Sequence, residues 1–327
     1  MLCRYGRAVT IGEELAMEVI NGWENWQPKY DHIFIALGNF DGVHLGHQQI
    51  IKSAREQASA EGGTAMVMVF EPHPKKILNP NAHLPLLTTR SEKKRLLEEM
   101  GVDVLLQIQF SEMLRRMNPR EFVVDFLRGR LGVAGVVVGY NYRFGYKGGG
   151  TSALLRRLGQ DTSLAVTVIP PVVVGDMVVS STIIRQLLGE GKVGVANSLL
   201  GRYFAITGTI VHGAKRGRHL GFPTANIQVM GKPALSRGVY LVRCRWAEHV
   251  FYGVANVGGC PTFGPGETRV EINLFDFQGE LYGEELTTEF IEYLRPERKF
   301  ASPRELQEQI GEDIRRARGI IARSIPL

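Results

Sequence analysis

The chain has 327 residues, of which 44% are hydrophobic and 22% are charged. This length and composition are typical of about two globular domains and exclude disordered and fibrous proteins. The three cysteines, Cys3, Cys244 and Cys260, are widely spaced and include no CxxC pair, so neither a disulfide framework nor a zinc site is predicted. A reducing, cytoplasmic location fits this cysteine usage best.

The formal net charge of +6 is divided equally along the chain, with +3 in residues 1–186 and +3 in residues 187–327, and there is no basic tail. An even excess of this size suits small phosphorylated ligands and is weak for nucleic acid. The first residues lack the apolar stretch of a signal peptide, and the most apolar segment, 164–174, is interrupted by Pro170 and Pro171. We therefore expect no nucleic-acid or membrane partner.

Short apolar runs alternate with amphipathic stretches in the first half of the chain. Continuous runs of Val, Ile, Leu and Met predict buried strands, and start signals at Ser91, Asn118 with Pro119, and Thr151 predict helices between them. This alternation predicts a doubly wound α/β domain, with a parallel sheet and helices on both faces. The predicted strands are Ile33–Leu37, Ala65–Phe70, Val104–Ile108, Gly135–Gly139 and Leu164–Ile169, and the predicted helices are Glu92–Met100, Arg120–Arg130 and Ser152–Gly159.

The second half begins with two predicted helices, Ser181–Glu190 and Val193–Leu200, and then changes to short β segments separated by Gly, Pro, Asn and Asp. Closely spaced strands with this punctuation predict a small antiparallel β-barrel. Near the end, Ser302, Pro303 and Glu305 form a capping-box start for a C-terminal helix across the barrel. The predicted barrel strands are Tyr203–Val211, Gly238–Arg245, Phe251–Val257, Val270–Phe275 and Leu286–Tyr293.

The first chemical motif is GNFDGVHLGH at residues 38–47, which directly follows the first predicted strand and opens the first helix. Phosphates bind at this place in a doubly wound sheet, because glycines let the backbone approach and free N–H groups at a helix start favour anions. His44 and His47 can donate hydrogen bonds there and stabilise charge at a reacting phosphorus. The alternative, that both histidines only cap a helix, is disfavoured by the position after a strand with glycine on both sides.

The second chemical motif lies at the start of the predicted barrel, where a glycine-rich basic segment, 208–220, runs into GFPTAN at 221–226. Glycines interleaved with Lys and Arg predict a flexible cationic loop suited to polyphosphate. Thr224 and Asn226 point the same way on an extended chain and offer neutral oxygens to a hard cation such as Mg²⁺. A plain turn is the alternative for Thr224, Ala225 and Asn226.

The first motif resembles the HxGH signature of the nucleotidylyltransferase superfamily, which transfers AMP or CMP from a nucleoside triphosphate and releases pyrophosphate. Three further segments, FEPHP at 70–74, GYNYRFG at 139–145 and SSTIIR at 180–185, look like those of the bacterial FAD synthetase module. The resemblance implies adenylyl transfer from ATP to the phosphate of FMN.

By this resemblance His44 and His47 bind the ATP phosphates and stabilise the transition state, Asn141 helps to hold the reactants, and Arg185 grips phosphate with its planar, charged fork. Asn141 stands where many relatives have Asp, and the run at 147–150 is richer in glycine than expected, so both departures bear on nucleotide or flavin affinity. The other nucleotide- or phosphate-binding residues that the resemblance implies here are Gly38, Phe40, Asp41, Gly46, Ser181 and Thr182.

GFPTAN looks like the PTAN motif of riboflavin kinase, and the similarity continues through GVANVG at 253–258, VE at 270–271 and LRPERKF at 294–300. It implies that Thr224 and Asn226 ligate Mg²⁺ beside ATP. It also implies that Glu271 is the general base that takes the proton from the riboflavin 5′-hydroxyl as it attacks the γ-phosphate. Further implied are a phosphate-binding set, Gly213, Gly217 and Arg218, and a flavin-binding set, Arg295, Arg298 and Phe300.

Both motif sets together resemble the prokaryotic type of bifunctional riboflavin kinase and FMN adenylyltransferase, in which residues 187–327 would convert riboflavin to FMN and residues 1–186 would convert FMN to FAD. The resemblance implies ATP and Mg²⁺ for each step. Two alternatives stay open. One is a nucleotidylyltransferase for another phosphorylated acceptor, against which the barrel argues. The other is a non-catalytic flavin-nucleotide-binding module, against which His44, His47 and Glu271 argue.

Overall fold

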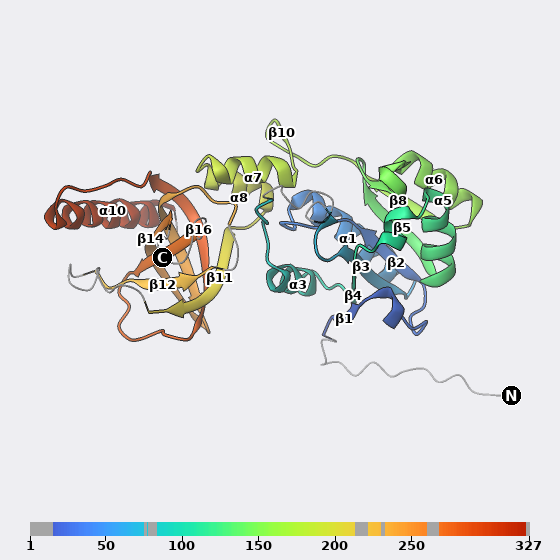
Figure 1. Cartoon of the computed structure of the whole chain (residues 1–327), viewed down its shortest axis with the longest axis horizontal. Coiled ribbons are helices and arrows are strands. Elements are labelled where there is room, and N and C mark those ends of the chain that lie inside the picture. Colours follow the sequence, from blue (N-terminus) through green and yellow to red (C-terminus); the bar gives the residue numbers. More distant parts are fainter. Residues whose placement is uncertain are drawn as a thin grey trace. The chain divides into compact units, whose positions relative to one another are not determined.

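The computed structural model describes residues 16–74, 77, 84–212, 222–229, 233–259 and 268–324. They form two compact units (Figure 1): a sheet unit, with described residues up to 39 and within 48–78 and 94–170, and a barrel unit, with those within 40–47, 79–93 and from 171 onward. The HxGH motif therefore belongs to the barrel unit. The predicted domain boundary after residue 186 falls inside helix α7 (Ser181–Gly189) and stays a prediction.

Six parallel strands form the sheet of the sheet unit, in the order β1-β4-β3-β2-β5-β8, and Figure 1 labels them. The order reverses between the paired strands β2 and β5, and α/β sheets bind ligands at the carboxyl edge beside such a switch point. The predicted parallel sheet is confirmed. The strands are β1 (Glu18–Asn21), β2 (Ile33–Leu37), β3 (Thr64–Phe70), β4 (Val104–Ile108), β5 (Val133–Gly139) and β8 (Ala165–Ile169).

Helices cover both faces of this sheet, as its continuous apolar strands predict. On one face Ile35 of β2 belongs to a buried cluster with Phe126 of η2, a π-helical segment that continues α5, and with Leu155 of α6. On the other face Phe34 packs with Ala58 of α1. The helices between β2 and β8 include α1 (Leu45–Ala60), α3 (Arg90–Glu99), α4 (Glu112–Arg116), α5 (Pro119–Glu121), η2 (Phe122–Arg130) and α6 (Ser152–Asp161).

Two of the three predicted helix starts in the first half are confirmed. The side chains of Asn118 and Thr151 each accept a hydrogen bond from a backbone N–H of the first turn. The prediction at Ser91 is wrong, because the Oγ1 of Thr89 accepts the capping hydrogen bond from the N–H of Glu92 at 3.1 Å and α3 begins before Ser91. Either hydroxyl can cap a helix, and the sequence does not rank them.

The edge strand β1 lies outside the predicted strands, since the first of those begins at Ile33. It pairs in parallel with β4, with Glu18 opposite Val104. Only Ile20 of its four side chains is buried, so β1 lacks the apolar run that reveals the central strands. Residues 18–21, which precede β2, therefore belong to the sheet.

Six antiparallel strands of the barrel unit close into a barrel in the order β11-β12-β15-β14-β13-β16, and β16 pairs back with β11. The inward-facing side chains, among them Ile210, Ile227, Val270 and Phe290, form its apolar core. The predicted barrel is confirmed. Its strands are β11 (Phe204–Val211), β12 (Ala225–Gln228), β13 (Gly238–Trp246), β14 (His249–Gly259), β15 (Thr268–Leu274) and β16 (Glu285–Arg295).

One barrel strand, β12, is absent from the predicted set although it contains Asn226 of the PTAN motif. Pro, Thr and Asn around it favour turns in isolation. Pairing with β11 on one side and β15 on the other overrides that local preference. The last two residues of the motif, Ala225 and Asn226, therefore begin a strand inside a continuous ladder.

The C-terminal helix α10 (Pro303–Ser324) packs on the outside of the barrel through apolar side chains such as Ala317. Its predicted start is confirmed, because the N–H of Glu305 donates to the Oγ of Ser302 at 3.2 Å. The second half of the predicted capping box differs by one residue. The carboxylate of Glu305 accepts from the N–H of Ala301 at 3.0 Å instead of the N–H of Ser302.

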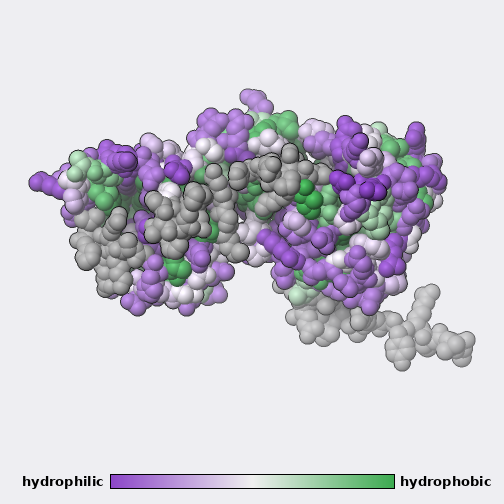
Figure 2. Space-filling model, in the orientation of Figure 1, coloured by the Kyte–Doolittle hydropathy of each residue, from purple (hydrophilic) through white to green (hydrophobic). Residues whose placement is uncertain are grey.

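The face of the molecule drawn in Figure 2 is mostly polar where it is coloured. Figure 2 shows hydrophilic residues over most of the visible face, with apolar residues in small separate patches. Large apolar side chains fill the cores of the sheet and the barrel, whereas a few, such as Met113 and Val250, are exposed.

Two predicted helices precede the barrel and are confirmed as α7 and α8 (Val193–Leu200). The buried side chain of Asn197 on α8 bridges the first and last barrel strands. Its Nδ2 donates to the carbonyl of Phe290 at 2.8 Å, and its Oδ1 accepts from the N–H of Phe204 at 2.7 Å. One side chain of α8 thus pairs with two backbone groups at buried positions of the barrel strands.

We expect Asn197→Ala to lower the free energy of unfolding by about 2–4 kcal/mol, because the substitution removes the hydrogen-bond partner of a buried carbonyl and of a buried N–H. Urea unfolding of the full chain measures the effect. Ser198→Ala, at an exposed neighbour on the same helix, should change it by less than about 0.5 kcal/mol. Equal values for the two variants would contradict the bridging role.

Candidate active sites

The loop Phe40–His47 continues from β2 and enters α1, and its backbone is unusual. Gly42 has φ +90°, and two residues with side chains, Phe40 and Val43, have φ of +47° and +38°. A Cβ on Gly42 would also lie 2.7 Å from the Cδ1 of Leu87. Glycine is therefore required at position 42 both by its conformation and by the close approach of Leu87.

The side chain of Asp41 holds this loop from within. It is 1% exposed, and its carboxylate accepts hydrogen bonds from the N–H groups of Leu87 and Thr88 at 3.0 and 3.2 Å. It also forms an ion pair with the guanidinium of Arg185. A buried carboxylate requires such compensation, so these contacts fix where the loop can lie.

The start of α7 supplies the other half of this contact. The Oγ of Ser181 donates to the carbonyl of Asp41 at 2.9 Å, and the Nε of Arg185 donates to the carbonyl of Pro85 at 2.9 Å. Thr182 is exposed. The structure thus brings Ser181 and Arg185, which the resemblance assigns to phosphate, onto the HxGH loop, where both have protein partners.

The two histidines of the motif lie face to face at the start of α1. Their ring centroids are 3.5 Å apart with an interplanar angle of 17°, and the edge of Phe40 meets the His47 ring. A Cβ on Gly46 would lie 3.3 Å from the His44 ring, so glycine leaves room for this stacking. Both rings are therefore held in one place by the loop that carries them.

Burial keeps both imidazoles neutral. It lowers the pKa of His44 to about 4 and brings the pKa of His47 well below its ordinary value. The Nδ1 of His44 accepts from the N–H of His47 at 3.2 Å, so the proton of the neutral ring is on Nε2. The Nδ1 of His47 is buried and has no hydrogen-bond partner among the described residues. Polar atoms of this kind suggest a missing ligand.

Gly38 and Asn141 lie in the sheet unit. Gly38 follows β2, and Asn141 is exposed in the turn after β5. Since β2 and β5 are paired and parallel, both residues lie at the carboxyl edge of the sheet beside the switch point. This is the position that the sequence predicts for the nucleotide.

The second group of candidates lies on the outer face of the barrel. Asn226 of β12, Glu271 of β15 and Asn256 of β14 stand directly opposite one another on three neighbouring strands. The residues on either side of Glu271, Val270 and Ile272, point into the buried core. Asn226 is 6% exposed. The three side chains form a polar row on a rigid sheet.

Arg269 joins this row, and sequence reasoning missed it. Its Nε and Nη2 donate to the Oδ1 of Asn226 at 2.9 and 2.6 Å, and its Nη2 lies 2.5 Å from the Oε1 of Glu271. The available signal is its position two residues before Glu271 on the same strand, which puts both side chains on one face.

The donor set in this row fits a hard cation. The neutral oxygen of Asn226 and the carboxylate of Glu271 already converge on one positive group, the guanidinium of Arg269, and Mg²⁺ prefers oxygen ligands of these kinds. Thr224, half-buried, lies two residues before Asn226. The described residues include no cluster of three or more His, Cys, Asp or Glu side chains that could hold a metal.

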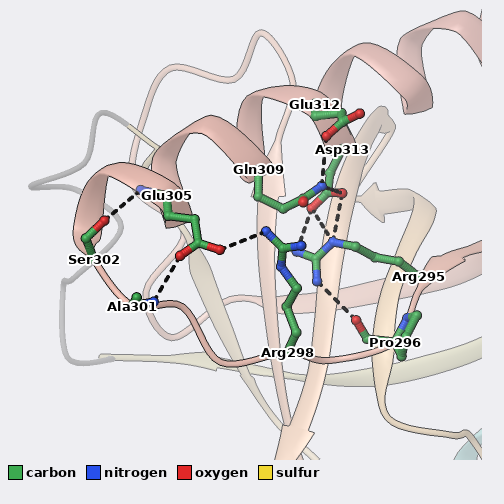
Figure 3. Close-up of polar contacts among 9 residues, drawn as sticks. All are labelled: Arg295, Pro296, Arg298, Ala301, Ser302, Glu305, Gln309, Glu312 and Asp313. Atoms are coloured by element: carbon green, nitrogen blue, oxygen red, sulfur yellow. Dashed lines mark hydrogen bonds and ion pairs between the residues drawn. The ribbon is translucent and has the colours of Figure 1, made fainter.

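The end of β16 and the segment after it carry the implied flavin-binding residues, and Figure 3 shows two of them, Arg295 and Arg298, turned toward α10. The Nε and Nη2 of Arg295 donate to the carboxylate of Asp313 at 2.9 and 2.8 Å, while Arg298 lies 3.3 Å from Glu305. Both guanidinium groups also lie over the ring of Phe300, at 5.7 and 4.6 Å from its centroid. These contacts tie α10 to the barrel.

Three of the implied phosphate-binding residues, Gly213, Gly217 and Arg218, lie outside the described residues. The same holds for Cys260.

Two family models match the chain: FAD synthetase over residues 27–183 and riboflavin kinase over residues 200–321. Among curated proteins, a bifunctional riboflavin kinase/FMN adenylyltransferase of Bacillus subtilis is 38% identical, over 85% of this chain and 89% of its own length. A protein of the same name from Pseudomonas fluorescens is 36% identical, over 94% of this chain and 99% of its own length.

A crystal structure from Streptococcus pneumoniae, named as a macrolide-efflux protein, has a TM-score of 0.84 and 30% identity and covers 92% of this chain and 99% of its own. In the part of this chain that the structure describes, none of the helices has the length and apolarity needed to span a bilayer. The likeness supports the fold, whereas the two family models and the curated relatives agree on one pair of activities. The chain belongs to the family of bifunctional riboflavin kinase/FMN adenylyltransferases.

Proposed function

We propose that the two groups of polar residues are two separate active sites, with FMN adenylyl transfer in residues 1–186 and riboflavin phosphorylation in residues 187–327. The chain is a transferase that uses ATP to convert riboflavin to FMN and FMN to FAD. One observation carries the assignment of sites: the FAD synthetase match contains the stacked histidine pair, and the riboflavin kinase match contains the row of Asn226, Arg269 and Glu271.

In adenylyl transfer a phosphate oxygen of FMN attacks the α-phosphorus of ATP, and the bond from that phosphorus to the bridging oxygen of pyrophosphate breaks. We assign His44 and His47 to the phosphate oxygens as neutral donors. The proton on the Nε2 of His44 and the unpartnered Nδ1 of His47 support this. Donors already fixed in place stabilise charge that builds up in the transition state. Gly38, Phe40, Asp41, Gly46, Asn141, Ser181, Thr182 and Arg185 would bind the nucleotide or hold the loop that does.

In the kinase step the riboflavin 5′-hydroxyl attacks the γ-phosphorus of ATP, and ADP leaves. We assign Glu271 as the base that accepts the hydroxyl proton, with its Oε1 held by Arg269. Thr224 and Asn226 would hold Mg²⁺, whose chemistry is to neutralise the phosphates. Gly213, Gly217 and Arg218 would bind ATP phosphates.

We propose that the flavin lies against the segment that contains Arg295, Arg298 and Phe300. The pairing of Arg295 with buried Asp313 supports a fixed position for this segment. We also propose a cytoplasmic location, on the cysteine usage of the sequence.

We expect His47→Ala to lower FAD formation from FMN by about 10²–10³-fold, the usual effect of losing a transition-state donor, and to leave FMN formation within about twofold. Glu271→Ala or Asn226→Ala should do the opposite. Chromatography of products from riboflavin or FMN with ATP and Mg²⁺ measures both steps. His249→Ala and Glu285→Ala, at exposed barrel positions, serve as matched controls. Loss of both steps in one variant would refute separate sites.

The neutral histidines also predict how stability depends on pH. Above about pH 6.5 His44 is neutral in both states, so it adds no dependence there. Between pH 6.5 and about 4 the unfolded chain binds a proton at His44 while the folded chain does not, so stability falls as the pH falls. We expect urea unfolding to show a shallower decline between pH 6.5 and 4.5 for His44→Gln than for the unmodified chain. Parallel declines would show that His44 titrates alike in both states.

A further inference from the structure

The carbonyl groups that precede His44 are held by a residue from the riboflavin kinase match. Arg202 donates through its Nη2 to the carbonyl of Gly42 at 2.8 Å and through its Nη1 to the carbonyl of Val43 at 3.2 Å. Both partners are consecutive carbonyls of the HxGH loop, and both lie in the barrel unit with Arg202. A single planar guanidinium thus fixes two successive peptide groups.

These two peptide groups are where the loop most needs support. Gly42 and Val43 both have positive φ, and a β-branched residue such as Val43 adopts this conformation only where its surroundings over-determine it. His44 is the next residue, so the orientation of the 43–44 peptide sets the direction in which its ring leaves the backbone. Arg202 therefore contacts the peptide group that joins Val43 to His44, the proposed phosphate donor.

Arg202 itself is mounted on a rigid frame. It follows Gly201, which ends α8 with φ +71° and whose N–H donates to the carbonyl of Asn197 at 2.9 Å. Two residues later, the N–H of Phe204 donates to the side chain of the same Asn197 as β11 begins. The backbone on both sides of Arg202 is thus fixed to α8, and the guanidinium reaches the loop from a defined base.

We propose that Arg202 is a positioning residue for FMN adenylyl transfer, supplied by the kinase part of the chain, which holds the Gly42 and Val43 carbonyls and so sets the position of His44. This rests on the proposed role of His44 and His47. It means that the FAD step depends on a residue outside the FAD synthetase match, which ends at residue 183.

Three variants of the full chain test the proposal: Arg202→Ala, Arg202→Gln and Arg202→Lys. We expect Ala and Gln to lower kcat for FAD formation by at least about tenfold while KM for FMN changes by less than about threefold. Lys keeps one donor to the loop and should recover part of kcat. FMN formation from riboflavin, measured on the same samples, should stay within about twofold and reports that the barrel has folded. Arg304→Ala, at an exposed position on α10, is the control.

The pH profile of FAD formation separates positioning from a general structural role. The positive charge of Arg202 is one of those that lower the pKa of both histidines. The acid limb of the profile should therefore move to higher pH in Arg202→Ala and stay in place in Arg202→Lys. An unmoved limb in both variants, or kcat values equal to those of the unmodified chain, would overturn the proposal.

Three other outcomes are also decisive. Equal loss of FMN and FAD formation in Arg202→Ala would make Arg202 a residue needed for folding and refute the specific role. If the unmodified chain makes FAD and His47→Ala does not, while Arg202→Ala behaves as unmodified, only the inference about Arg202 fails. If His47→Ala still makes FAD at the normal rate, the proposed function of the loop fails first.

Discussion

The carboxylate of Asp41 is buried, and the arrangement around the first site depends on satisfying it. A charge in this environment is tolerated only with a partner of opposite sign and further hydrogen bonds. Leu87, Thr88 and Arg185 provide these from segments far away in the sequence. These contacts hold the loop in a conformation with positive φ at Phe40, Gly42 and Val43. The histidine pair lies on the same loop, so the buried ion pair also helps to fix the place of both rings.

The second site depends on a different constraint, the alternation of side chains along the strands of a closed barrel. Inward positions such as Val270 and Ile272 fill the core, and the positions between them are left for Arg269 and Glu271. Three adjacent strands bring Asn226, Glu271 and their neighbours into one row without any loop. Sites on rigid elements hold their geometry better than sites on loops, which suits proton removal from a hydroxyl.

Much of the framework could be predicted from the sequence, because its signals are local. A continuous apolar run identified the central strand β2 to the residue. The bounds of β4 and α8 were also predicted to the residue, although each carries a buried polar side chain, Gln107 or Asn197, among its apolar ones. The strand β1 and the PTAN strand β12 escaped, because each is four residues long and is defined by its pairing partners. For the strands, length and apolarity were the whole of the signal.

The candidate residues themselves were predicted by motif, but their contacts were not. The pairing of Asp41 with Arg185 joins positions 144 residues apart, and nothing near either residue indicates it. Arg269 and Arg202 carry no motif, and only the fold shows that they reach Glu271 and the carbonyl of Val43. Spacing in a sequence gives the type of chemistry, whereas long-range pairing decides which groups hold the reacting ones in place.

The row on the outer face of the barrel links chemistry to strand register. A slip of β15 by one residue against its neighbours would turn Glu271 into the apolar interior and bring Val270 or Ile272 out to face Asn226. A one-residue slip moves all of these side chains at once, because successive side chains of a strand point to opposite faces. If Glu271 has the role that we propose, riboflavin kinase activity therefore reports whether the barrel has closed with its strands correctly aligned.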